Sequence, residues 1–89
     1  KELKIIQKKV PNLEASLAEK VVKTVQLLRN TEIRKKPGIS ETIDWANALF
    51  SLEIDNLTNT VIEETALAFL KNREDLDKLR DIDLSSVLD

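Results

Sequence analysis

The chain has 89 residues, of which 42% are hydrophobic and 34% charged, with one glycine, two prolines and a formal net charge of −2. Cysteine and histidine are absent, which excludes disulfide bonds, thiolate or imidazole metal sites and the Ser-His-Asp catalytic triad. This length and the scarcity of turn residues predict one small all-α domain over residues 1–89, a bundle of four to five helices.

Two helices are predicted in the first third of the chain. Pro11 ends the first, which we expect over residues 2–9 because its apolar residues have helical spacing. Asn12 is a favourable N-cap for the second, which we expect to run to about residue 30. Its apolar residues recur at intervals of four and three positions, namely Leu13, Leu17, Val21, Val25 and Leu28.

The periodicity is lost over residues 31–38, where Pro37 and Gly38 favour a connector. Both residues are therefore interpreted as structural, because they shape the turn into the next helix. The connector also contains a run of three cations, which could bind phosphate: Arg34, Lys35 and Lys36.

A third helix is expected over residues 41–53. Ser40 offers an N-cap hydroxyl, and Glu41 places an acidic side chain in the first turn, where the helix dipole favours it. Trp45 lies on the apolar stripe of this helix. At that spacing a tryptophan is typical of a core or interface residue whose indole N–H finds a hydrogen-bond partner.

Two starts are possible for a fourth helix. Thr60 with Glu63 fits a capping box, whereas Thr58 as N-cap would place Leu57 against Ile62 as a hydrophobic staple. We predict the start at Thr58.

The fourth helix is expected to reach about residue 71. The following sequence can extend it or begin a fifth helix, since Asn72 or Asp75 could serve as its N-cap. Residues 81–89 are expected to be a loose tail or one helical turn at most.

Charge is distributed unevenly along the chain. Residues 1–36 contain ten lysines and arginines against four acidic residues, a net charge of +6, and residues 37–89 contain four against twelve, a net charge of −8. Such asymmetry is typical of solvated helix surfaces that attract each other within one fold. The basic third could instead be the contact surface of a free-standing helical module that binds protein or nucleic acid.

Few residues suggest catalytic chemistry. With Gly38 as the only glycine, the chain cannot form a glycine-rich phosphate-binding loop. The acidic residues Glu63, Glu64, Glu74, Asp75 and Asp77 are interpreted as solvated surface, because neighbouring residues of a helix point in different directions. We therefore predict no catalytic residue and no metal site. No apolar run is long enough for a membrane span and no signal peptide is evident, so we expect a cytoplasmic chain without a membrane partner.

Three segments together resemble a known family. They are "RKKPGISETIDWANAL" at residues 34–49, "KKVPNLEASLAEKVVKTVQLLR" before it and "LTNTVIEETALAFLKNRED" after it. In helix order, connector and the "ETIDWA" motif they resemble the C-terminal helical lid of MoxR-type AAA+ ATPases, in the branch often found beside von Willebrand factor A domain proteins. The resemblance covers about residues 8–75.

This resemblance implies that the chain is a segment of a longer ATPase, and a start at Lys1 without any methionine agrees with that expectation. An upstream α/β core would bind ATP and Mg²⁺, and the lid would close over the nucleotide without binding a cofactor by itself. The isolated segment would have no enzymatic activity. Such ATPases are chaperone-like hexameric rings, so the implied partners are the core, neighbouring subunits and a remodelled protein, such as a von Willebrand factor A domain protein.

The resemblance also implies which residues face the nucleotide. Many AAA+ lids carry a sensor-2 arginine near the start of the third helix, but this sequence has Ser40 at that place. Either a connector cation substitutes for the arginine, or this branch senses nucleotide without it. The nucleotide-facing candidates are Arg34, Lys35, Lys36, Ser40 and Glu41, although an N-cap role is the better interpretation of Ser40. Nucleic acid is not an expected partner, because the chain is acidic overall and has few aromatic residues.

Overall fold

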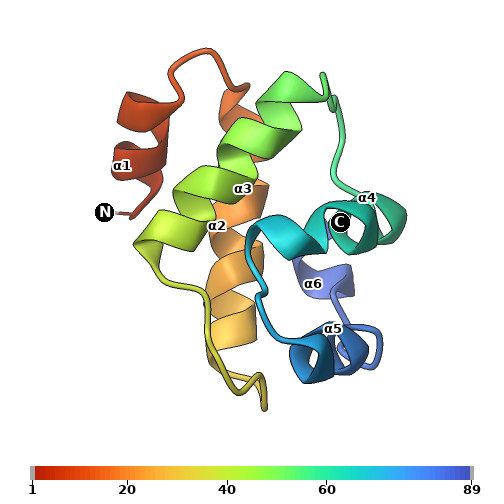
Figure 1. Ribbon diagram of the computed structural model, residues 1–89. Helices are drawn as coiled ribbons and strands as arrows, with labels where there is room; N and C mark the ends of the chain where they lie inside the picture. Colours follow the sequence, from red (N-terminus) through yellow and green to blue (C-terminus); the bar gives the residue numbers. More distant parts are fainter. Residues whose placement is uncertain (1, 89) are drawn as a thin grey trace.

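A computed structural model describes residues 2–88 and is helical throughout (Figure 1). Within these residues there are six α-helices, one short 3-10 helix and no strands. The elements are α1 (Glu2–Lys9), α2 (Ala15–Arg29), α3 (Ile39–Ser51), α4 (Asn59–Thr65), η1 (Ala66–Ala68), α5 (Arg73–Leu79) and α6 (Ser85–Leu88). The predicted all-α bundle is confirmed. It has more helices than expected because the C-terminal residues add the short α6.

The two longest helices, α2 and α3, cross at the centre of the molecule (Figure 1). α1 packs against both of them on one side, and α4, η1, α5 and α6 lie on the other. The predicted apolar row of α2 forms the middle of the core: Leu13, Leu17, Val21, Val25 and Leu28 are all buried. None of the helices among residues 2–88 is long and apolar enough to cross a membrane.

Trp45 joins the two halves of the core, as its position on the apolar stripe predicted. The side chain is completely buried, and its Nε1 donates a hydrogen bond of 2.8 Å to Oγ1 of Thr65 in α4. The Thr65 hydroxyl in turn donates to the carbonyl oxygen of Val61. The indole also packs against Phe69, with 4.3 Å between ring centroids. Trp45 is thus a core residue with a satisfied N–H.

The predicted N-cap of α2 is wrong. The helix begins at Ala15 with Glu14 as its N-cap, and Asn12 lies in the preceding turn. Leu13 is buried and its amide donates to the Val10 carbonyl oxygen at 3.1 Å, so this turn must close before the helix starts. The Glu14 side chain makes no cap hydrogen bond with α2, and the Glu14 carbonyl oxygen accepts the first helical bond, from the Ala18 amide.

The predicted N-cap of α3 is also wrong. Gly38 is the N-cap, and Ser40 is an exposed residue inside the first turn. The carboxylate of Glu41 accepts a hydrogen bond of 2.9 Å from the Gly38 amide, which is one half of a capping box. Thr42 strengthens this start because both its amide and its hydroxyl donate to the Gly38 carbonyl oxygen, at 3.1 and 2.8 Å. The carboxylate at the third helical position therefore places the helix start two residues earlier than predicted.

The start of α4 is confirmed, because the Thr58 hydroxyl accepts from the Val61 amide at 3.2 Å. The predicted extension of this helix to residue 71 is wrong. α4 ends at Thr65 and tightens into η1, where the amides of Phe69 and Leu70 both donate to the Ala66 carbonyl oxygen. The Phe69 and Leu70 side chains that follow this turn are both buried in the core.

The structure decides two points about the C-terminal segment: which residue caps the fifth helix and whether the tail is helical. Asn72 caps α5, accepting from the Glu74 amide at 2.8 Å. Of the two forms expected for the tail, the described part has the single helical turn, α6. Leu84, just before it, is only 4% exposed and belongs to the core, so this part of the tail is packed against the bundle. Residue 89 lies outside the described residues.

Candidate anion site beside the start of α3

A buried carboxylate holds the connector between α2 and α3. Asp75, in the first turn of α5, is completely buried. Its two oxygens accept hydrogen bonds from the backbone amides of Arg34 and Lys35, at 2.7 and 2.9 Å. Burial by itself raises the pKa of Asp75, but these two amides and the nearby charges of Lys78 and Arg34 outweigh it, so the pKa lies below its usual value. The charged form therefore fixes the backbone of the cationic connector.

The sequence interpretation of Asp75 as solvated surface, or as an N-cap, is wrong. A signal for its burial was nevertheless present, because Leu79 stands four residues further on and is buried in the core. Residues four apart share one face of a helix, which places Asp75 on the inward face of α5. A carboxylate on an inward face needs hydrogen-bond donors, and here the connector supplies them from 40 and 41 residues away.

The connector lysines meet a third lysine at a small hollow beside the start of α3. The hollow has a volume of about 90 Å³. Its lining residues come from the connector, from the first turn of α3 and from the segment after η1: Lys35, Lys36, Pro37, Glu41, Phe69 and Lys71. We call this the lysine hollow. Of the sequence candidates, it brings together Lys35, Lys36 and Glu41, and it adds Lys71, which sequence reasoning missed.

The remaining candidates lie elsewhere. Arg34 does not line the lysine hollow; its guanidinium is 3.5 Å from the carboxylate of Glu74, and both side chains are largely exposed. Ser40 is exposed on the first turn of α3 and does not line the hollow either. The position at which the resemblance places a sensor-2 arginine therefore contributes no group to this site.

Glu41 reduces the net positive charge of the lysine hollow. Its carboxylate accepts from the Gly38 amide, and this bond together with its own backbone amide lowers the pKa of Glu41, with smaller contributions from the charges of Lys71 and Lys35. The carboxylate therefore occupies the N-terminus of α3 itself, where an anion could otherwise bind. Three lysines against one carboxylate still leave an excess of positive charge at the hollow.

An ion pair that the sequence analysis did not single out ties the other side of the connector to α1. The guanidinium of Arg29 binds both carboxylate oxygens of Glu2, at 2.9 and 2.7 Å, and its Nε donates to the Pro37 carbonyl oxygen at 2.7 Å. The Thr42 hydroxyl, whose shorter bond is to the Gly38 carbonyl oxygen, also lies 3.3 Å from a carboxylate oxygen of Glu2. The hydrogen bond from Arg29 is the main reason that the pKa of Glu2 is lowered. α1, α2, the connector and α3 are thereby linked at one point.

The basic third of the chain does not form one continuous surface. α1 begins next to the connector, at the Glu2–Arg29 pair, and runs away from it toward the opposite end of the molecule (Figure 1). Lys8 and Lys9 are at that far end of α1. They do not add to the lysine hollow, whose third cation comes instead from Lys71.

The described residues contain no group of three or more His, Cys, Asp or Glu side chains that could hold a metal ion. Comparisons with known proteins found no match: no protein-family model, no curated protein and no solved structure is significantly similar to this chain.

Proposed function

We propose that this chain is the helical lid of an AAA+ ATPase, in which the lysine hollow faces the phosphates of ATP bound to an α/β core. The observation that supports this proposal best is the lysine hollow itself. Two lysines of the connector and one from the segment after η1 line the same small hollow, and the buried Asp75 fixes the connector that carries two of them.

The size of the lysine hollow suits a lid better than a self-sufficient nucleotide site. Pockets that enclose a small-molecule ligand usually measure about 300–1,000 Å³, whereas this hollow measures about 90 Å³. It has room for the edge of a phosphate group but not for a nucleotide. Compact ammonium groups can contact the phosphate oxygens of a nucleotide that is bound mainly by another domain. The α/β core would be that domain, and it would also bind Mg²⁺.

The connections around the hollow support movement as one unit. Arg29 links α1, α2 and the connector, and Asp75 links the connector to α5. Attraction between the lysines and the phosphates would therefore move the whole bundle rather than a loop. Rigid-body rotation of this kind can transmit the difference between ATP and ADP to neighbouring subunits and to a remodelled partner protein.

The first test is the coding sequence upstream of Lys1. The proposal expects a G-x-x-x-x-G-K-[ST] motif after a strand pattern within the preceding few hundred codons. A start codon immediately before Lys1 would refute it.

The second test uses the full-length ATPase. We expect Lys35→Ala, Lys36→Ala and Lys71→Ala together to lower the rate of ATP hydrolysis about tenfold or more, because a hydrogen bond to a charged group contributes about 1.5–3 kcal/mol. The matched control is Lys23→Ala, which removes an exposed cation on α2 that does not line the hollow. Circular dichroism would check that the helices persist. Equal hydrolysis by the wild type and the triple variant, or an equal loss in the control, would contradict a phosphate-facing hollow.

The alternative is a free-standing module that binds protein or nucleic acid through the basic third. The structure offers it less support, because Arg29 is paired with Glu2, and Lys8 and Lys9 lie in the last turn of α1, away from the connector lysines. Binding of the chain to DNA or RNA that falls steeply with added salt would favour this alternative.

A further inference from the structure

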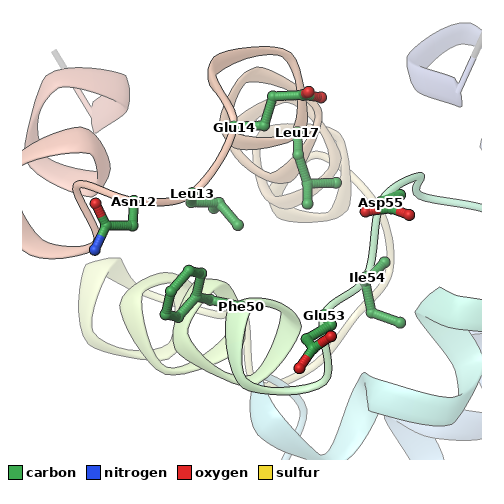
Figure 2. Close-up of a pocket in the computed structure, with 8 residues that line it drawn as sticks. All are labelled: Asn12, Leu13, Glu14, Leu17, Phe50, Glu53, Ile54 and Asp55. Atoms are coloured by element: carbon green, nitrogen blue, oxygen red, sulfur yellow. The ribbon is translucent and has the colours of Figure 1, made fainter.

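A second hollow lies between the turn after α1, the start of α2 and the end of α3 (Figure 2). Its volume is about 200 Å³. Leu13 and Leu17 point toward it from one side, with the ring of Phe50 across from them and Ile54 beside it. Phe50 is 44% exposed, so the hollow presents apolar surface to the outside.

Carboxylates surround this apolar surface. Glu14, Glu53 and Asp55 line the hollow together with Asn12, and no ion pair involves any of the three carboxylates among residues 2–88. We call this the acidic hollow. An apolar surface with unpaired carboxylates around it is complementary to an apolar side chain that has cations beside it.

The exposed face of α1 has this complementary chemistry. Ile5 is 42% exposed although it is a large aliphatic residue. Lys8 and Lys9 follow three and four residues later, on the same face of the helix, and both are exposed. Ile6, the next residue and about 100° further around the helix, is buried in the core.

The chain does not use this face of α1 to fill its own acidic hollow. Ile5, Lys8 and Lys9 are all absent from the residues that line it. The Glu2–Arg29 pair and the buried Ile6 hold α1 in place. The apolar surface of the hollow is therefore open to a second molecule.

We propose that the acidic hollow binds the exposed face of α1 from a second copy of this chain. Ile5 of one copy enters the apolar surface beside Phe50 of the other, and Lys8 and Lys9 lie against the surrounding carboxylates. The two surfaces are different parts of the molecule, so the contact is heterologous and builds head-to-tail chains or rings. This contact does not depend on the nucleotide role proposed above.

Because the contact is small, we expect weak association, with a dissociation constant of about 0.1–1 mM. Sedimentation velocity over this concentration range should show self-association at about 20 mM salt that weakens about tenfold at about 500 mM salt. Amide NMR spectra recorded at increasing concentration should show shifts confined to α1 and to the residues around the acidic hollow. A chain that stays monomeric at low salt, or shifts that fall on other surfaces, would overturn the proposal.

Variants identify the two surfaces separately. Ile5→Ser should weaken association about tenfold, whereas the matched control Leu67→Ser, which removes an apolar side chain that is 69% exposed on η1, should have no effect. Glu53→Lys with Asp55→Lys should abolish association, and so should Lys8→Glu with Lys9→Glu. One chain carrying all four substitutions should associate again, because the charges of the two surfaces are exchanged. An equal effect of Leu67→Ser, or no recovery in a folded fourfold variant, would refute the contact.

Discussion

Asp75→Ala tests the carboxylate that holds the connector. The substitution removes both acceptors of the Arg34 and Lys35 amides. A hydrogen bond to a charged group contributes about 1.5–3 kcal/mol, but the released amides belong to residues with exposed side chains and can bind water. We therefore expect a loss of about 2–4 kcal/mol in the free energy of unfolding. For a domain of this size that corresponds to a decrease in Tm of roughly 10–25 °C.

Urea denaturation followed by circular dichroism at neutral pH measures this loss. Amide hydrogen exchange at residues 34 and 35 measures the release of the connector directly. The matched control is Glu74→Ala, because Glu74 occupies the same first turn of α5 but is exposed. Both substitutions remove a negative charge near the helix N-terminus, and only Asp75→Ala removes the link to the connector.

Two results would refute this reasoning. One is a loss of stability in Asp75→Ala no larger than that in Glu74→Ala, which we expect to be below about 1 kcal/mol. The other is unchanged exchange of the Arg34 and Lys35 amides, which would mean that other contacts hold the connector.

Three further predictions concern pH and stability. The pKa values of Asp75 and Glu2 lie below their usual values of 3.8 and 4.5. Ionised Asp75 and Glu2 therefore stabilise the folded state fully above about pH 5, and this stabilisation is lost as the pH falls through the lowered pKa values. Denaturation midpoints should decrease in acid, and the decrease should be smaller in Asp75→Ala. Glu53 has a φ of 57° just after α3. Left-handed backbone costs a non-glycine residue about 1–2 kcal/mol and the extra entropy of glycine offsets about 0.5–1 kcal/mol of that, so Glu53→Gly should raise the free energy of unfolding in urea by roughly 0.5–1 kcal/mol, whereas Glu53→Ala should give no gain. Among residues 2–88 the buried hydroxyl of Thr24 has no hydrogen-bond partner, so Thr24→Val should raise the urea midpoint by an equivalent of about 0.5–2 kcal/mol, and a lower midpoint would contradict that assignment.

Local signals predicted much of the helical structure and left the cap of α5 open between two candidates. The spacing of the apolar residues in α2 identified a row that is buried, and Trp45 is in the core with its N–H bonded. Thr58 and Asn72 cap α4 and α5 through their own side chains. Except for the Trp45–Thr65 hydrogen bond, these features depend on residues within about four positions of each other. Such interactions can be predicted from the local sequence.

Local signals failed at the starts of α2 and α3. Asn12 and Ser40 are both favourable cap residues, yet Glu14 and Gly38 precede the helices. In the first case burial of Leu13 closes a turn before the helix starts. Intrinsic preferences of about 1 kcal/mol between cap residues are small enough for such packing to override them.

The sequence by itself determined the all-α class, the order of the helices and the cationic connector, because helical periodicity and composition are local properties. The resemblance to AAA+ lids adds a function that remains a proposal. Only the tertiary structure decided that Asp75 is buried against the connector and that Lys71 joins Lys35 and Lys36 at one hollow. These contacts join residues 35–41 positions apart, so they depend on how the helices cross in space, and no spacing along the chain encodes that crossing.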